Sequence, residues 1–193
     1  MRSLLLLFLG SHPDHRFDRA VRALIAHPSF PNQGHPMTTT ATKHTAAPQD
    51  AIALLKADHE AVSQLFDEYE KTRSLLNKKS LVAEICSSLS VHAQIEEEIF
   101  YPAVKAALKD KILVPEATVE HAGVKGLISQ LQGLELDDEM YDAKVKVLSE
   151  YVKHHVKEEQ NEMFPKVKAS SLDIVELGAS MSARKDELLS HKT

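Results

Sequence analysis

Apolar residues recur at every third or fourth position from Gln49 onward, which is the spacing of the buried face of an amphipathic helix. Four such stripes follow one another along the chain, and each contains a histidine among its apolar residues. In two of them a glutamate also occupies an inward position. The stripes comprise Ile52, Leu55, His59, Val62, Phe66 and Tyr69; Leu81, Ile85, Leu89, His92, Glu96 and Ile99; Ala117, His121, Val124, Ile128 and Leu131; and Tyr141, Val145, Leu148, Val152, His155, Glu159 and Met163.

Short polar breaks separate the four stripes, at 72–79, 110–115 and 134–139. Because long helices joined by short connections pack antiparallel, the pattern predicts an all-α fold, an up-down-up-down four-helix bundle. We expect a short fifth C-terminal helix over about 172–190, capped by Ser170 or Ser171, to pack on the bundle. The chain has only 6 glycines and no tryptophan, a composition that suits helices.

The first 48 residues lack this periodicity, and we interpret 1–48 as a disordered or non-native extension before a domain at 49–190. The apolar run in MRSLLLLFLG is too short to span a membrane and lies at the lower limit for a signal peptide. The composition changes at Met37, which we take as the native start; a targeting peptide is the alternative. The single cysteine, Cys86, excludes an internal disulfide and suits a reducing compartment, so we expect a cytoplasmic protein.

Two segments of the chain resemble each other, HAQIEEEIFYP at 92–102 and HHVKEEQNEMFP at 154–165. A histidine, the glutamate four residues later and a proline each recur at the same interval, at 92/155, 96/159 and 102/165. His59 and His121, on the other two stripes, are separated by nearly the same interval. The chain is therefore interpreted as a duplicated helical hairpin, whose two copies bring both HxxxE pairs into the core. Each proline is expected to kink or end its helix.

The inward histidines and glutamates form a set suited to metal, while their neighbours His154 and Glu158 face outward in this register or support the ligands from behind. Two facing buried glutamates repel each other unless cations lie between them. Two divalent ions would share both carboxylates, and a bridging oxo or hydroxo group would leave each ion one open position. Nitrogen and carboxylate ligands around an open octahedral position favour non-haem iron, with manganese or zinc as alternatives. The candidate metal ligands are His59, His92, Glu96, His121, His155 and Glu159.

These residues resemble the hemerythrin-like family, also called the HHE cation-binding domain, whose pattern H…HxxxE…H…HxxxE lies on a four-helix bundle. The resemblance implies a non-haem di-iron centre in which both glutamates bridge and the histidines pair on the two irons as His59 with His92 and His121 with His155. Oxygen-carrying members have a histidine and an aspartate where this chain has Lys125 and Gln160. The pattern is closer to the di-iron domain of iron–sulfur cluster repair proteins, whose cysteine-bearing amino-terminal domain has no counterpart in this sequence.

We expect a protein that binds or senses a small ligand, namely oxygen, nitric oxide or peroxide, at the open iron position. The alternatives are iron handling or donation in oxidative or nitrosative stress and iron–sulfur cluster repair, a di-iron enzyme that reduces peroxide or nitric oxide with Tyr101 or Tyr151 nearby, and a structural bundle holding zinc. A lone HxxxE pair is commonly a surface ion pair, so the hypothesis depends on the duplicated spacing. The net charge of -5 argues against nucleic acid as a partner, no segment suits a membrane, and the protein partner stays unknown.

Overall fold

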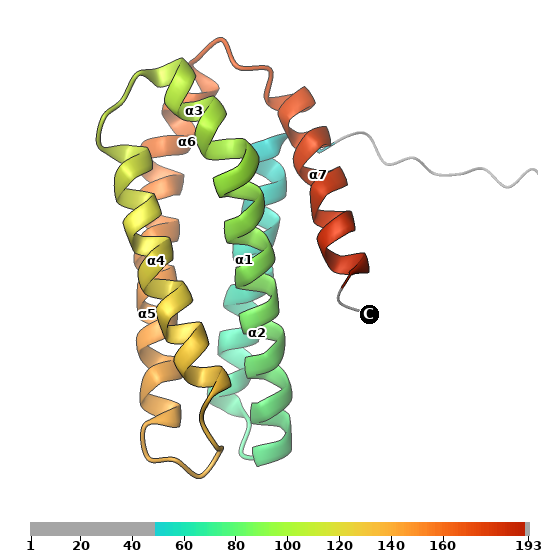
Figure 1. The fold of residues 1–193 in the computed structure, drawn as a ribbon, viewed down its shortest axis with the longest axis vertical. Coiled ribbons are helices and arrows are strands. Elements are labelled where there is room, and N and C mark those ends of the chain that lie inside the picture. Colours follow the sequence, from blue (N-terminus) through green and yellow to red (C-terminus); the bar gives the residue numbers. More distant parts are fainter. Residues whose placement is uncertain (1–48, 192–193) are drawn as a thin grey trace, which may run out of the picture. The chain divides into compact units, whose positions relative to one another are not determined.

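The computed structural model of the protein describes residues 49–191, and its long helices lie side by side as a bundle (Figure 1). The four long members are α1 (Ala51–Lys71), α2 (Leu75–Ile95), α4 (Leu113–Gln132) and α5 (Tyr141–Glu158). Helix α1 packs against α2 and α5, and α4 packs against α5 and α2, so the four helices enclose a common core. The all-α, up-down-up-down architecture predicted from the periodicity is confirmed.

Polar side chains cap the N-termini of the first two helices. The Asp50 carboxylate accepts a hydrogen bond from the Ala53 N–H at 2.8 Å, and the Ser74 hydroxyl accepts one from an N–H in the first turn of α2. Residues 72–74 alone connect α1 to α2, so the break predicted here was too long. The reason is that α2 starts with two exposed leucines, which favour the helix by propensity without joining the core stripe.

The fifth helix, α7 (Ile174–Ser190), packs against α1 and α2, as Figure 1 shows. Its cap is Asp173, whose carboxylate accepts hydrogen bonds from two N–H groups of the first turn, so the prediction of Ser170 or Ser171 as the cap was wrong. A carboxylate is at least as good a cap as a hydroxyl and also complements the helix dipole. The fully buried Met181 joins α7 to the core.

Two turns of π-helix interrupt the second and fourth long helices. They are η1 (Glu96–Phe100) and η2 (Glu159–Met163), and the helices then continue as α3 (Tyr101–Leu108) and α6 (Phe164–Lys168). Each π turn closes with a hydrogen bond from the N–H of the residue after it to the carbonyl oxygen of the glutamate five residues earlier. Turns of this kind are rare and concentrate at functional sites.

Each π turn directly precedes the helix segment that carries one of the two prolines. Pro102 and Pro165 lack the N–H of an ordinary helix, and their rings press on the carbonyl four residues back, which the wider turn accommodates. The prolines were expected to kink or end their helices; the helices do not end there but continue through the π turns into α3 and α6. The extra residue also shifts the register, so Phe100 and Tyr101 are buried, whereas Ile99, predicted to face inward, is only partly buried.

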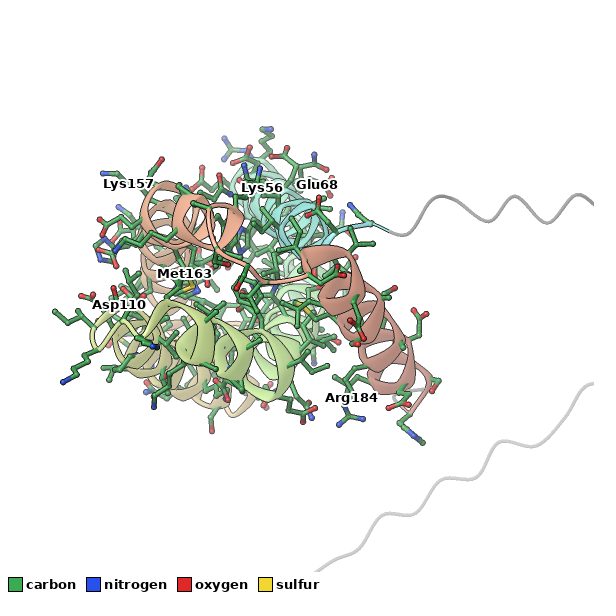
Figure 2. All side chains as sticks on the ribbon, turned by 90° about the horizontal axis from the view of Figure 1, so that it is seen from above. Lys56, Glu68, Asp110, Lys157, Met163 and Arg184 are labelled. Atoms are coloured by element: carbon green, nitrogen blue, oxygen red, sulfur yellow. The ribbon has the colours of Figure 1, made fainter. Side chains whose placement is uncertain are left out.

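The core consists of two apolar clusters. One cluster, which includes Phe100 and Met181, joins α1 and α2 to α3, α6 and α7, and the other, which includes Phe66 and Leu148, joins the opposite ends of the four long helices. Figure 2 looks along the bundle and shows Met163 inside it, with charged side chains around the outside. On α1, α2 and α4, and on α5 together with η2, the motif histidine stands between the residues of one cluster and those of the other.

Cys86 is buried in the second apolar cluster, and burial raises the pKa of its thiol, which keeps the group protonated and unreactive. Among residues 49–191, no helix has the length and apolar character needed to cross a membrane. The expected extension at 1–48 and the proposed start at Met37 lie outside the described residues.

Candidate metal centre

Six buried polar side chains meet in the layer between the two apolar clusters. Helices α1 and α4 each contribute one histidine, while α2 and α5 each contribute a histidine and lead into a π turn that begins with a glutamate. None of the six is more than 7% exposed. The structure thus brings together all the residues that the sequence singles out, namely His59, His92, Glu96, His121, His155 and Glu159.

The four histidines form two pairs. Nε2 of His59 lies 3.1 Å from Nε2 of His92. Nε2 of His121 likewise lies 3.1 Å from Nε2 of His155. Two nitrogens that bind one ion with bonds of about 2.1 Å, at roughly a right angle, are separated by about 3 Å. Each pair therefore has the separation of two neighbouring ligands on one metal ion.

Each glutamate reaches both histidine pairs. Glu96 Oε2 lies 3.1 Å from Nε2 of His92 and 3.3 Å from Nε2 of His121. Glu159 Oε2 lies 3.3 and 3.6 Å from Nε2 of the remaining histidine in each pair. A carboxylate placed beside one histidine of each pair stands where a ligand shared by two ions is required.

Two oxygens of these glutamates are buried without a hydrogen bond. Within residues 49–191, Glu96 Oε1 and Glu159 Oε2 lack a hydrogen-bond partner. An unsatisfied buried carboxylate oxygen is costly, and a bound cation removes that cost. Imidazole nitrogens and carboxylate oxygens are also ligands that iron, manganese and zinc accept. The cluster fits a metal site on both counts.

Acidic residues from α1 and α4 support the histidine of the neighbouring helix. Asp58 Oδ2 lies 3.5 Å from Nδ1 of His92, and Glu120 Oε2 lies 2.7 Å from Nδ1 of His155. Lys185 of α7 forms an ion pair with Asp58, so the fifth helix also supports the site. A partner on Nδ1 fixes the ring orientation and leaves Nε2 free to bind metal.

Residues that directly follow the two glutamates contact the other two histidines. Glu97 Oε1 lies 3.0 Å from Nδ1 of His121 and also pairs with Lys125, whose nitrogen is 2.6 Å from its second oxygen. Gln160 occupies the corresponding place after Glu159, and its side-chain nitrogen lies 3.3 Å from Nδ1 of His59. Every histidine of the cluster therefore has a polar partner on Nδ1, its outer nitrogen.

Mutual electrostatics set the protonation of the cluster when it holds no metal. Burial opposes charge on His92, but the Glu96 carboxylate, the hydrogen bond to Asp58 and the charge of Glu159 together outweigh burial and raise the pKa of His92 to about 10. The pKa of His121 is raised in the same sense, against burial, by its hydrogen bond to Glu96. In return, these two histidines hold the pKa of Glu96 well below its usual value despite burial. A metal ion must displace these protons in order to bind.

The Tyr101 hydroxyl enters the layer from α3. It donates a hydrogen bond to Glu159 Oε1 at 2.9 Å and lies 3.2 Å from Nε2 of His121. Burial and the nearby carboxylates raise the pKa of Tyr101, so the phenol stays protonated. Tyr151, the other tyrosine considered from the sequence, is 52% exposed and lies beside Gly123, away from the site.

A small cavity of about 20 Å³ adjoins all four histidines. This volume accommodates a molecule about the size of water. Asp58 and the histidines supply its polar edge, and the remaining wall is apolar, formed by Val62, Leu89, Ala93, Val124, Val152 and Val156. A small molecule that enters the layer of histidines and glutamates through this cavity therefore passes apolar side chains.

Comparison with known proteins places this site in a family. The family model of the Hemerythrin HHE cation binding domain matches residues 50–167. The chain belongs to this family. It is also similar to the crystal structure of a hemerythrin HHE cation binding domain-containing protein from Mycobacterium kansasii, with a TM-score of 0.62 and 26% identity, covering 72% of this chain and 86% of that one.

A DNA nickase from Nostoc sp. is 25% identical to this hemerythrin HHE chain over 135 residues. The match covers 70% of the chain but 37% of the nickase, so the chain corresponds to well under half of that protein.

Sequence reasoning did not assign the outer partners of this hemerythrin HHE site. A signal was present, because an acid directly precedes the first histidine of each hairpin, as Asp58 before His59 and Glu120 before His121. Those acids contact the histidine of the adjacent helix, and only the packed structure reveals that pairing. The burial of Tyr101 was likewise hidden by the register shift at the π turn.

Proposed function

We propose that the chain holds two non-haem irons at its buried cluster and binds a small ligand there, namely oxygen, nitric oxide or peroxide. The observation that carries the proposal is the cavity of about 20 Å³ beside the four histidines. The cavity holds little more than one water molecule, so it suits a ligand of about two heavy atoms better than a larger substrate. The ligands we assign to the irons are His59, His92, Glu96, His121, His155 and Glu159.

The residues of the chain prepare the cluster for this role. The partners on Nδ1 of each histidine orient the rings so that all four Nε2 atoms face inward. The cavity wall beside the four histidines includes the apolar side chains of Val62 and Val152, which disfavour bulk water there. Tyr101 supplies a protonated hydroxyl at the opposite side, next to Glu159. Iron held in such a place supplies an open coordination position for a small ligand and a change of oxidation state.

The nicking activity named for the Nostoc relative is not extended to this chain. The matched segment is 37% of that protein, and the net charge of -5 does not favour contact with nucleic acid. Iron handling or donation is the alternative that we retain, because the same ligand set would serve it. It requires metal that leaves readily, so retention of both irons against a strong chelator counts against it.

A cavity-filling variant tests the proposal. The full chain is loaded with ferrous iron without oxygen and titrated with nitric oxide, and the optical spectrum is followed. Val152→Phe places a ring in the cavity, whereas Val147→Phe, on the exposed face of the same helix, is the matched control. Because the new ring occupies the space that the ligand needs, we expect nitric oxide binding to weaken by about tenfold or more, a loss of about 1.4 kcal/mol or more of binding free energy, in Val152→Phe alone.

Iron content is measured in every sample, so that loss of metal is separated from loss of ligand binding. No spectral response of the iron-loaded wild-type chain would reject ligand binding. An equal response of Val152→Phe and Val147→Phe, at equal iron content, would reject the cavity as the place of binding.

A further inference from the structure

The internal repeat allows the two halves of the cluster to be compared position by position. Glu97 and Gln160 are equivalent, because each directly follows the glutamate of its HxxxE pair, and each contacts the outer nitrogen of a histidine from the other hairpin. Glu97 gives His121 a carboxylate at 3.0 Å, whereas Gln160 gives His59 an uncharged amide at 3.3 Å. The other two outer partners, Asp58 beside His92 and Glu120 beside His155, are both carboxylates.

A second pair of equivalent residues breaks the symmetry in the same direction. Tyr101 and Phe164 correspond in the repeat, because each stands directly after a π turn and directly before the proline. The Tyr101 hydroxyl lies 3.2 Å from Nε2 of His121. Phe164 has no hydroxyl and stacks its ring on His59, with 6.0 Å between ring centroids and 4° between the planes. The polar members of both unequal pairs thus contact His121, and the less polar members contact His59.

The acceptor on Nδ1 controls how strongly Nε2 binds metal. A histidine that binds through Nε2 carries its proton on Nδ1, and a carboxylate that accepts a hydrogen bond from this N–H makes the ring a stronger ligand. Changes in such partners alter metal affinity by roughly 10–100-fold. An amide oxygen accepts without a negative charge. In the structure the Gln160 amide also presents its nitrogen to His59, so it must turn over before it can accept.

The nearby lysines do not cancel this difference. Lys125 neutralises Glu97 and Lys185 neutralises Asp58, so each histidine pair has one outer carboxylate matched by a lysine. The pair His121 and His155 retains a further carboxylate, Glu120, at 2.7 Å from Nδ1. The second outer partner of the pair His59 and His92 is the uncharged Gln160, so this pair has no outer carboxylate beyond the one matched by Lys185.

We propose that the two metal positions are unequal, an inference that rests on the two-iron site proposed above. The position of His121 and His155 fills first and holds its ion tightly. The position of His59 and His92 fills second and exchanges its ion. Gln160 is the positioning residue that sets the difference, acting through His59.

The test is a titration of the metal-free full chain with ferrous ion in the absence of oxygen, followed by calorimetry. Wild type is expected to bind two ions in two steps whose affinities differ by roughly 10–100-fold. Gln160→Glu, which restores the symmetry, should strengthen the weak step and bring the two together. Glu97→Gln should weaken the strong step. Gln132→Glu adds the same charge at an exposed position and should leave both steps unchanged.

The outcomes separate this inference from the proposed function. Binding of fewer than two ions by wild type would overturn the two-iron site itself. Two ions bound with equal affinity would leave that site standing and overturn the inequality. Two unequal steps that Gln160→Glu and Glu97→Gln both leave unchanged would overturn the role of Gln160.

Discussion

Removal of a single buried oxygen atom, in Tyr101→Phe, is expected to destabilise the metal-free protein by about 2 kcal/mol, because the lost hydrogen bond has a charged acceptor. The Tyr101 side chain is 3% exposed, and its hydroxyl donates to the Glu159 carboxylate at 2.9 Å. A hydrogen bond to a charged group contributes about 1.5–3 kcal/mol, and phenylalanine keeps the ring and its packing. A domain of this size loses roughly 2–4 °C in Tm for each kcal/mol, so a fall of about 4–8 °C is expected.

Thermal unfolding of metal-free protein, followed by circular dichroism, measures this change. Tyr151→Phe is the matched control, because Tyr151 is 52% exposed. The Tm of this variant is expected to stay within about 2 °C of wild type. Equal Tm values for Tyr101→Phe and Tyr151→Phe would refute the reasoning, since they would mean that the buried hydroxyl does not stabilise Glu159.

Three further changes test other parts of the structure. The raised pKa of His92, about 10 against 6.5, stabilises the metal-free fold below about pH 6.5, and this contribution is lost as pH rises through about 10. Since metal binds the deprotonated ring, the rise in Tm on adding metal should be larger near pH 9 than near pH 7; a rise independent of pH would contradict the proton competition. Gly178→Ala puts a Cβ 2.6 Å from the backbone nitrogen of Ala51, and urea unfolding should reveal a loss of about 1–3 kcal/mol, whereas Gly126→Ala, with open space around it, should lose nothing. Glu96→Gln removes one shared carboxylate, so metal analysis should find fewer than two ions per chain, and two tightly held ions would contradict the assignment.

The periodicity was sufficient to predict the bundle and the inward position of all six candidate ligands. That prediction worked because burial on a helix follows 3.6-residue spacing, and the histidines occupy positions that apolar residues otherwise fill. The internal repeat also predicted that two similar hairpins pack together. It identified His155 as the inward histidine in preference to His154, which is exposed in the structure. Their role in binding metal stays a prediction.

Other features depend on information that is not local in sequence. The π turns at Glu96 and Glu159 add one residue to a helical repeat, so extrapolating the stripe past Glu96 selected Ile99 in place of Phe100 and Tyr101. Proline signals a disturbed helix, but the surrounding packing decides whether the helix ends or widens. The partner of each Nδ1 comes from another helix, and side-chain contacts of that kind follow from tertiary packing alone.

The charged layer that separates the two apolar clusters affects how the protein unfolds. A core unfolds cooperatively when the opening of one part destabilises the other. Here the two apolar clusters are separated by histidines and glutamates, whose mutual attraction depends on their protonation. We expect that, without metal, the amide hydrogens of the half near α7 and of the half near the 72–74 turn exchange at different rates. Ions shared by ligands from four helices would join the halves into one cooperative unit, so a single bound metal cluster would govern the kinetic stability of the whole bundle.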